Sequence, residues 1–220
     1  MPRDEGGYGD RMQLGDILHT SVLYQDKIAD FNFFAVGGWS QTQPNDNGMF
    51  NDMIGMGAAG QMAGMGYSQE QISGALSMLG LEGTPNTSSE NGYSVFIGGR
   101  YDIDAIGLKL GFEYNYGSEY WISMSPGQDD IYQGKLSTRG SVYEVYAVYD
   151  LPTGDAVSKY AKTFIRLGYQ RYEYDYSGSM DWNVKPYDLD DAALMAVWEQ
   201  GGSELVKSAN QVYLTLEAFF

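Results

Sequence analysis

The sequence contains no cysteine and a single histidine, His19, among its 220 residues. The lack of cysteine excludes disulfide bonds, thiolate metal sites and cysteine nucleophiles, and one imidazole is too few for a histidine-rich metal centre. His19 has no fixed spacing to a nucleophile, so we interpret it as a polar strand residue rather than a general base. We therefore expect no enzymatic activity and no cofactor.

Basic residues are also scarce, with 13 Lys and Arg against 29 Asp and Glu and a net charge of -16. No basic cluster is present, which excludes nucleic acid as a partner. No stretch approaches the roughly 18 apolar residues of a membrane helix. Proline is rare at 6 residues, whereas 19 tyrosines and 29 glycines favour strands with aromatic belts.

Polar and apolar residues alternate most clearly in the sequence GLKLGFEYNYG at 107–117. This pattern predicts a strand with one apolar and one polar face. The run at 93–103 repeats it, and residues 104–107 predict a hairpin between the two. The expected lipid-facing residues are Ile97, Leu110, Phe112, Tyr114, Val145, Leu167 and Leu214. The expected lumen-lining residues are Arg100, Lys109, Glu113, Asn115, Glu144 and Arg166.

Further alternating runs predict strands at about 11–25, 29–42, 138–150, 162–177 and 209–220. Together these patterns predict an all-β, antiparallel, up-and-down transmembrane β-barrel in one domain, 1–220. Seven strands are visible, but bacterial barrels have an even number and at least about eight. Either a strand is missed, or missing N-terminal strands or a partner chain complete a larger barrel.

The connections alternate between short turns and long links. The long links cover about 43–92, 122–137 and 178–208, as expected for extracellular loops opposite short periplasmic turns. Ser68 and Gln71 have capping-box spacing before a short helix, and Asp188 or Asp190 is expected to cap another. The stretch rich in methionine and glycine at 48–66 is interpreted as a mobile loop.

The last strand, ANQVYLTLEAFF, ends on an aromatic residue. Leu214, Leu216 and Phe220 share its apolar face, and a terminal Phe resembles the signal read by the outer-membrane barrel assembly machinery. We expect these residues to act in assembly. The alternative is an amphipathic edge strand that happens to end in Phe.

The segments GLKLGFEYNYGSEYW, TRGSVYEVYAVYDLP and FIRLGYQRYEYDYSGS resemble an uncharacterised family of porin-like outer-membrane proteins of Gram-negative bacteria. Members of that family resemble larger barrels with a signal peptide. The resemblance therefore implies that this chain corresponds to the C-terminal part of such a barrel. The first residues, MPRDEGG, lack signal-peptide features, so we expect either prior cleavage or a longer gene product.

Asp188, Asp190 and Asp191 form the densest acidic group. Their spacing differs from that of an EF-hand loop, so they are weak candidates for a metal site and are better explained as helix caps. The three long links carry 13 acidic and 3 basic residues, a net charge of -10. Such loops are expected to concentrate cations near a pore mouth.

These patterns lead to one main expectation and one alternative. We expect a porin-like barrel of the outer membrane that passes small polar solutes or ions, with outer-membrane lipid and lipopolysaccharide as its surroundings. The alternative is a barrel that acts as a structural or binding scaffold, whose acidic extracellular loops engage a ligand or partner protein.

Overall fold

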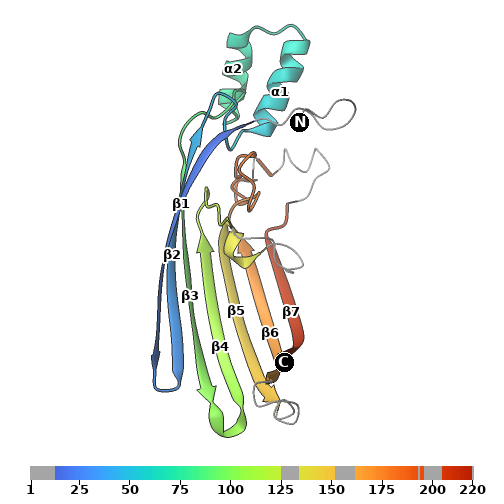
Figure 1. Ribbon diagram of the computed structural model, residues 1–220. Coiled ribbons are helices and arrows are strands. Elements are labelled where there is room, and N and C mark those ends of the chain that lie inside the picture. Colours follow the sequence, from blue (N-terminus) through green and yellow to red (C-terminus); the bar gives the residue numbers. More distant parts are fainter. Residues whose placement is uncertain (1–12, 125–133, 152–161, 193, 196–204, 220) are drawn as a thin grey trace, which may run out of the picture. The chain divides into compact units, whose positions relative to one another are not determined.

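A computed structural model describes residues 13–124, 134–151, 162–192, 194–195 and 205–219. Seven strands in this part of the chain form one antiparallel meander sheet, in which neighbours in sequence are neighbours in space (Figure 1). The strands are β1 (Gly15–Ile28), β2 (Phe31–Pro44), β3 (Asn91–Ile103), β4 (Leu108–Gly117), β5 (Gly140–Leu151), β6 (Lys162–Tyr174) and β7 (Ser208–Phe219). The seven expected strands are thus confirmed, with boundaries shifted by a few residues.

The sheet is not closed into a barrel. Within the described residues, β1 pairs only with β2 and β7 only with β6. The antiparallel up-and-down sheet is thus confirmed, a barrel closed by these strands is not formed, and a larger barrel completed by further strands stays a prediction. Alternation predicts which residues share a face, because side chains alternate along a strand, but it carries no information about what pairs with the two edges.

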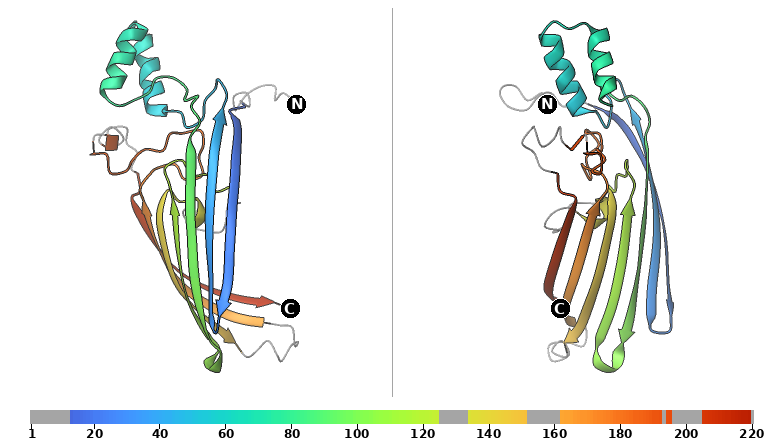
Figure 2. Two further views of the ribbon diagram at one scale, coloured as in Figure 1. Left: turned by 90° about the vertical axis from the view of Figure 1, so that its left-hand side faces the viewer. Right: turned by 180° about the vertical axis from the view of Figure 1, so that it is seen from behind.

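The two faces of the sheet differ in composition as the alternation predicts. Leu110 and Val145 are 47% and 56% exposed on the apolar face, and Leu214 on β7 is 71% exposed. The register places Leu110 opposite Ala147, which in turn lies opposite Leu167. The apolar side chains therefore form continuous rows across β4 to β7. These four strands share a common twist, which is visible in Figure 2.

Short turns and long links alternate along the chain. Residues 29–30 join β1 to β2, and a 3₁₀ turn at Asp104–Ile106 with Gly107 in the left-handed region (φ 64°) joins β3 to β4. The long links run from 45 to 90, from 118 to 139 and from 175 to 207. The residues that join β5 to β6, at 152–161, lie outside the described residues.

By its internal contacts the chain divides into two units. One comprises Gln41–Asn91 and Asp181–Pro186 together with the chain up to Leu18, and it contains both α-helices, α1 (Met53–Gly64) and α2 (Gln69–Met78). The other contains most of the sheet. Among the described residues, no helix is long and apolar enough to cross a membrane.

The helix α2 confirms the predicted capping box. Ser68 and Gln71 bond reciprocally through side chain and backbone, and Ile72 and Leu76 are buried. The helix α1 corrects the interpretation of residues 48–66 as a mobile loop. Its four glycines have low helix propensity and no apolar stripe marks it.

The helix α1 is held by its N-cap residue. Asp52 accepts hydrogen bonds from Gly55 N and Glu82 N, both at 2.9 Å, which ties the start of the helix to the segment that follows α2. A Cβ atom at Gly55 would collide with the backbone of Glu82. Glycine, which weakens the helix elsewhere, is therefore required at this contact.

Candidate functional site

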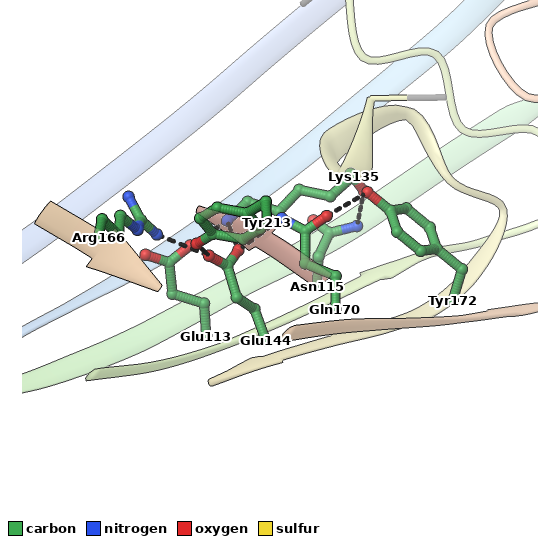
Figure 3. Close-up of polar contacts among 8 residues, drawn as sticks. All are labelled: Glu113, Asn115, Lys135, Glu144, Arg166, Gln170, Tyr172 and Tyr213. Carbon is green, nitrogen blue, oxygen red and sulfur yellow. Dashed lines mark hydrogen bonds and ion pairs between the residues drawn. The ribbon is translucent and has the colours of Figure 1, made fainter. Parts of the chain in front are cut away.

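The polar face of the sheet carries a cluster of charged side chains around Glu144, which is only 2% exposed (Figure 3). We refer to it as the Glu144 cluster. Its members are Glu113, Lys135, Glu144, Arg166, Gln170 and Tyr213. They come from β4, β5, β6, β7 and the link between β4 and β5.

Both carboxylate oxygens of Glu144 are fully engaged. Oε1 accepts from Arg166 Nη2 at 2.6 Å and from the Tyr213 hydroxyl. Oε2 accepts from Lys135 Nζ at 2.6 Å and from Gln170 Nε2 at 3.0 Å. A buried carboxylate is tolerated only when it is paired and hydrogen-bonded, and these four donors meet that requirement.

The strand register explains why a cation is needed here. Glu113 on β4 lies directly opposite Glu144 on β5, and like charges facing each other across a sheet are destabilising. Lys135 binds both carboxylates. It is carried by a 3₁₀ turn, Lys135–Ser137, whose first carbonyl accepts from Asn115 Nδ2 at 2.7 Å.

Arg166 is positioned by two tyrosines. Its guanidinium lies 4.0 Å from the ring centroid of Tyr146 and 5.4 Å from that of Tyr213, which is the geometry of a cation–π contact. The Arg166 Nε atom has no hydrogen-bond partner among the described residues. This atom is buried, so one donor of the cluster is left without a protein acceptor in the described part of the chain.

The cluster contains two carboxylates and two cations, so its formal charges cancel. Nowhere in the described chain do three or more His, Cys, Asp or Glu side chains converge to hold a metal ion.

The remaining predicted lumen residues form separate ion pairs near the short turns. Arg100 bonds Asp102 at 2.7 Å, and Lys109 bonds Asp150 at 2.6 Å. The structure therefore brings together Glu113, Asn115, Glu144 and Arg166, and places Arg100 and Lys109 apart from them.

A pocket lined by aromatic rings lies on the same face of β1 to β4. Its volume is about 460 Å³, and its walls include His19, Phe34, Phe96 and Trp121. The ring centroids of His19 and Trp121 are 5.2 Å apart, and those of Phe34 and Phe96 are 4.7 Å apart. His19 is thus on the expected polar face, but among rings rather than with catalytic partners.

Trp121 is seated in a gap left by glycines. A Cβ atom at Gly38 on β2 would lie 2.5 Å from Trp121 Cη2, and one at Gly117 on β4 would lie 2.8 Å from Cδ1. The indole Nε1 donates to the Leu136 carbonyl at 2.8 Å. Trp121 therefore anchors the turn that carries Lys135 to the sheet.

The acidic group at 188–191 binds the backbone and a lysine. Asp188 Oδ1 accepts from Asp190 N, and Asp190 pairs with Lys207 at 3.2 Å. Asp191, rather than Asp188 or Asp190, caps the following helical turn by accepting from Leu194 N. The expected cap was Asp188 or Asp190, because no spacing in the sequence distinguishes these residues from Asp191.

The predicted assembly residues lie on or beyond β7. Leu214 and Leu216 are exposed on its apolar face, opposite Leu167 and Ile165. Phe220 lies outside the described residues. Nothing in the contacts of Leu214 and Leu216 tests a role in assembly, which stays a prediction.

Sequence reasoning missed Lys135, Gln170 and Tyr213 as members of the Glu144 cluster. Gln170 and Tyr213 occupy polar-face positions of alternating strands, so the alternation already indicated the face on which they lie. Lys135 had a weaker signal, as the sole basic residue of the segment 122–137. Its approach to the sheet depends on a loop fold that alternation does not encode.

Comparison with known proteins gives a family and no function. No curated protein and no solved structure matches the chain. A family model described as "Protein of unknown function (DUF3373)" matches residues 3–220. Nearly the whole sequence is covered, and the chain belongs to the DUF3373 family.

Proposed function

We propose that the chain forms part of the wall of a porin-like β-barrel in the bacterial outer membrane, which passes small polar solutes or ions. The observation that carries the proposal is the division of the sheet into an exposed apolar face and a paired, charged face. Monomeric proteins in water rarely expose large continuous apolar patches, whereas a membrane barrel requires an apolar outer band and a polar interior.

Strand length supports the same proposal. The strands contain 10 to 14 residues, and a tilted strand needs about 9–11 residues to cross the hydrocarbon core. Tyrosines near the strand ends, such as Tyr93 and Tyr149, are exposed on the apolar face. Aromatic girdles at the two interfaces are typical of such barrels.

The proposed lumen has a narrow part at the Glu144 cluster. The turn at Lys135–Ser137 lies over the polar face, and its lysine reaches the centre of the cluster. Because the cluster is neutral, we assign charge selectivity to the acidic long links rather than to this constriction.

The test is reconstitution of the purified protein into planar bilayers, together with fractionation of cells. We expect the protein in the outer-membrane fraction, a gel mobility that changes when the sample is boiled, and discrete conductance steps. Lys135→Gln should change the step size, whereas Lys207→Gln, which removes a lysine paired with the exposed Asp190, should not. A protein found in the soluble fraction would contradict the proposal.

Conductance also separates the two candidate functions. The turn Lys135–Ser137 covers part of the polar face, which favours a narrow or sealed bore over a wide pore. A protein that resides in the outer membrane and passes no ions would support the scaffold whose acidic loops bind a partner, and would contradict the pore.

A further inference from the structure

The two edge strands of the sheet run in the same direction. Seven strands pair antiparallel in sequence order, so the first and last of them are parallel to each other. The arrowheads of β1 and β7 both point toward the end of the sheet that holds the short turns (Figures 1 and 2).

Neither edge strand is short, and the charged residues of both lie near their ends, at Asp16, Asp26 and Lys27 on β1 and at Glu217 on β7. β1 contains 14 residues and β7 contains 12, and neither strand contains a proline. Exposed apolar residues follow both edges, including Val22 and Tyr24 on β1 and Val212 and Leu216 on β7. Natural edge strands are usually short, charged or blocked by proline, so these two are built to be paired.

We propose that a β-segment other than these seven strands pairs with β1 and with β7, and that it contributes an odd number of antiparallel strands. The inference rests on the proposed function, since an unpaired backbone group in lipid costs several kcal/mol. One strand, or any odd number, can be antiparallel to both edges. The total then becomes even, as in bacterial barrels.

The direction of the edges argues against the two simpler closures. If β1 met β7 of the same chain, the pair would be parallel. If two copies inserted in the same orientation shared one barrel, β7 of one copy would meet β1 of the other, and that pair would be parallel too. A sheet that is antiparallel throughout would then contain a less stable parallel seam.

The edges also define the chemistry of the closing segment. Val22 and Leu214 lie on the apolar face of their strands, and Ser21 and Tyr213 lie on the polar face. Each terminal strand of the segment must therefore alternate, with its apolar residues on the side of Val22 and Leu214. It must span about 9–11 residues to follow the edges across the membrane.

Photocrosslinking in cells tests the proposal. The crosslinking residue p-benzoylphenylalanine is placed at Val22 or at Leu214, and the crosslinked peptides are mapped by mass spectrometry. A matched position at Val145, between Phe112 and Tyr169 in the register, must crosslink to β4 or β6 and controls for folding. We expect Val22 to crosslink to β2 and Leu214 to β6, and each of them to crosslink in addition to a segment outside the seven strands.

A second arm uses the absence of cysteine. Val22→Cys with Leu214→Cys should form no disulfide within one chain, nor between two singly substituted copies, whereas Leu110→Cys with Ala147→Cys, directly opposite each other, should form one. A β1–β7 crosslink or disulfide, or edges that crosslink only to β2 and β6 in a folded protein, would overturn the proposal. Fractionation of the same cells reports separately on the membrane location, so failure of the two proposals is distinguishable.

Discussion

Tyr213 on β7 lies directly opposite Gly168 on β6, and the missing side chain lets the tyrosine ring lie across the neighbouring strand. The hydroxyl thereby reaches Glu144 on β5, one strand further on. Tyr146 and Gly111 form a similar pair between β5 and β4. Two facing pairs of tyrosine and glycine thus place Arg166 and Glu144 in contact.

The Tyr213 hydroxyl should contribute measurably to stability. Tyr213→Phe removes a donor to a buried carboxylate, and such a bond is worth about 1.5–3 kcal/mol. Tyr169→Phe is the matched control, because its hydroxyl binds the exposed Asn210 at 2.6 Å and should cost under about 1 kcal/mol. Equilibrium unfolding in detergent compares the two. Equal losses of unfolding free energy in the two variants would show that the hydrogen bond to Glu144 stabilises the protein no more than an exposed one.

Lys135 should hold the facing carboxylates together. Lys135→Gln leaves Glu113 and Glu144 without the bridging cation. We expect the free energy of unfolding to fall by about 2–4 kcal/mol, and no further, because Glu144 keeps its ion pair with Arg166. Adding Glu113→Gln removes the repulsion and should restore part of the stability. Urea titration of the single and double variants measures both effects. No recovery in the double variant would mean that the loss comes from the turn itself.

The membrane proposal predicts opposite responses at two adjacent residues. Val22 and Ser21 are both exposed and lie at neighbouring positions of β1, but on different faces. In lipid vesicles Val22→Arg should lower the free energy of unfolding by about 2–4 kcal/mol, whereas Ser21→Arg should leave it nearly unchanged. If the apolar face contacts water instead, both changes should be mild, and that result would argue against a lipid-facing surface.

The acidic links should give the pore a modest preference for cations. Neutralising Asp188, Asp190 and Asp191 to Asn preserves the acceptor oxygens that cap the backbone. It removes three of the thirteen acidic charges in the segments 43–92, 122–137 and 178–208. Reversal potentials across a salt gradient should move toward zero. The preference should also weaken at 1 M salt, where the Debye length is about 3 Å. Anion preference in the unmodified protein would contradict this role.

Asp175 should make the folded protein slightly more stable at acidic pH. It follows β6, and partial burial, with Asp190 and Asp188 nearby, raises the pKa of its carboxyl group above the usual value. The folded state therefore binds this proton more tightly than the unfolded state, and the resulting stability is lost as the pH rises through the folded pKa. Asp175→Asn should raise the free energy of unfolding by under about 1 kcal/mol at pH 7, because solvent screens the interaction. At pH 3 it should leave the free energy of unfolding unchanged.

Unfolding titrations at the two pH values measure that difference. Asp150→Asn is a useful contrast, because it breaks the pair with Lys109 and should not stabilise the protein at pH 7. A gain at pH 3 as large as that at pH 7 would show that the Asp175 effect is not electrostatic.

The strands were predictable because each has a clear polar and apolar side. The alternation around Leu110 and Glu113 sets the face of each side chain, and the register then puts Glu113 beside Glu144. The capping box at Ser68 was equally local. By contrast, α1 depends on Asp52 reaching Glu82, thirty residues away, and on packing that propensity does not contain.

The arrangement of the Glu144 cluster was predictable only in part. Inward positions gave Glu113, Glu144 and Arg166, but Lys135 arrives from a link with no repeating pattern. Its position depends on Trp121 and Asn115, which contact the turn from two different segments. Such long-range contacts are decided by the folded sheet and not by the neighbouring residues.

The position of Trp121 also makes the turn that carries Lys135 depend on two hairpins at once. Gly38 belongs to the first hairpin and Gly117 to the second, so the indole has no seat until the two hairpins have joined. Both hairpins therefore contribute to the position of the Lys135 turn through Trp121, while Asn115 on β4 binds the turn directly. A side chain added at Gly38 on β2 would displace the indole and, through the turn, the lysine that bridges Glu113 and Glu144.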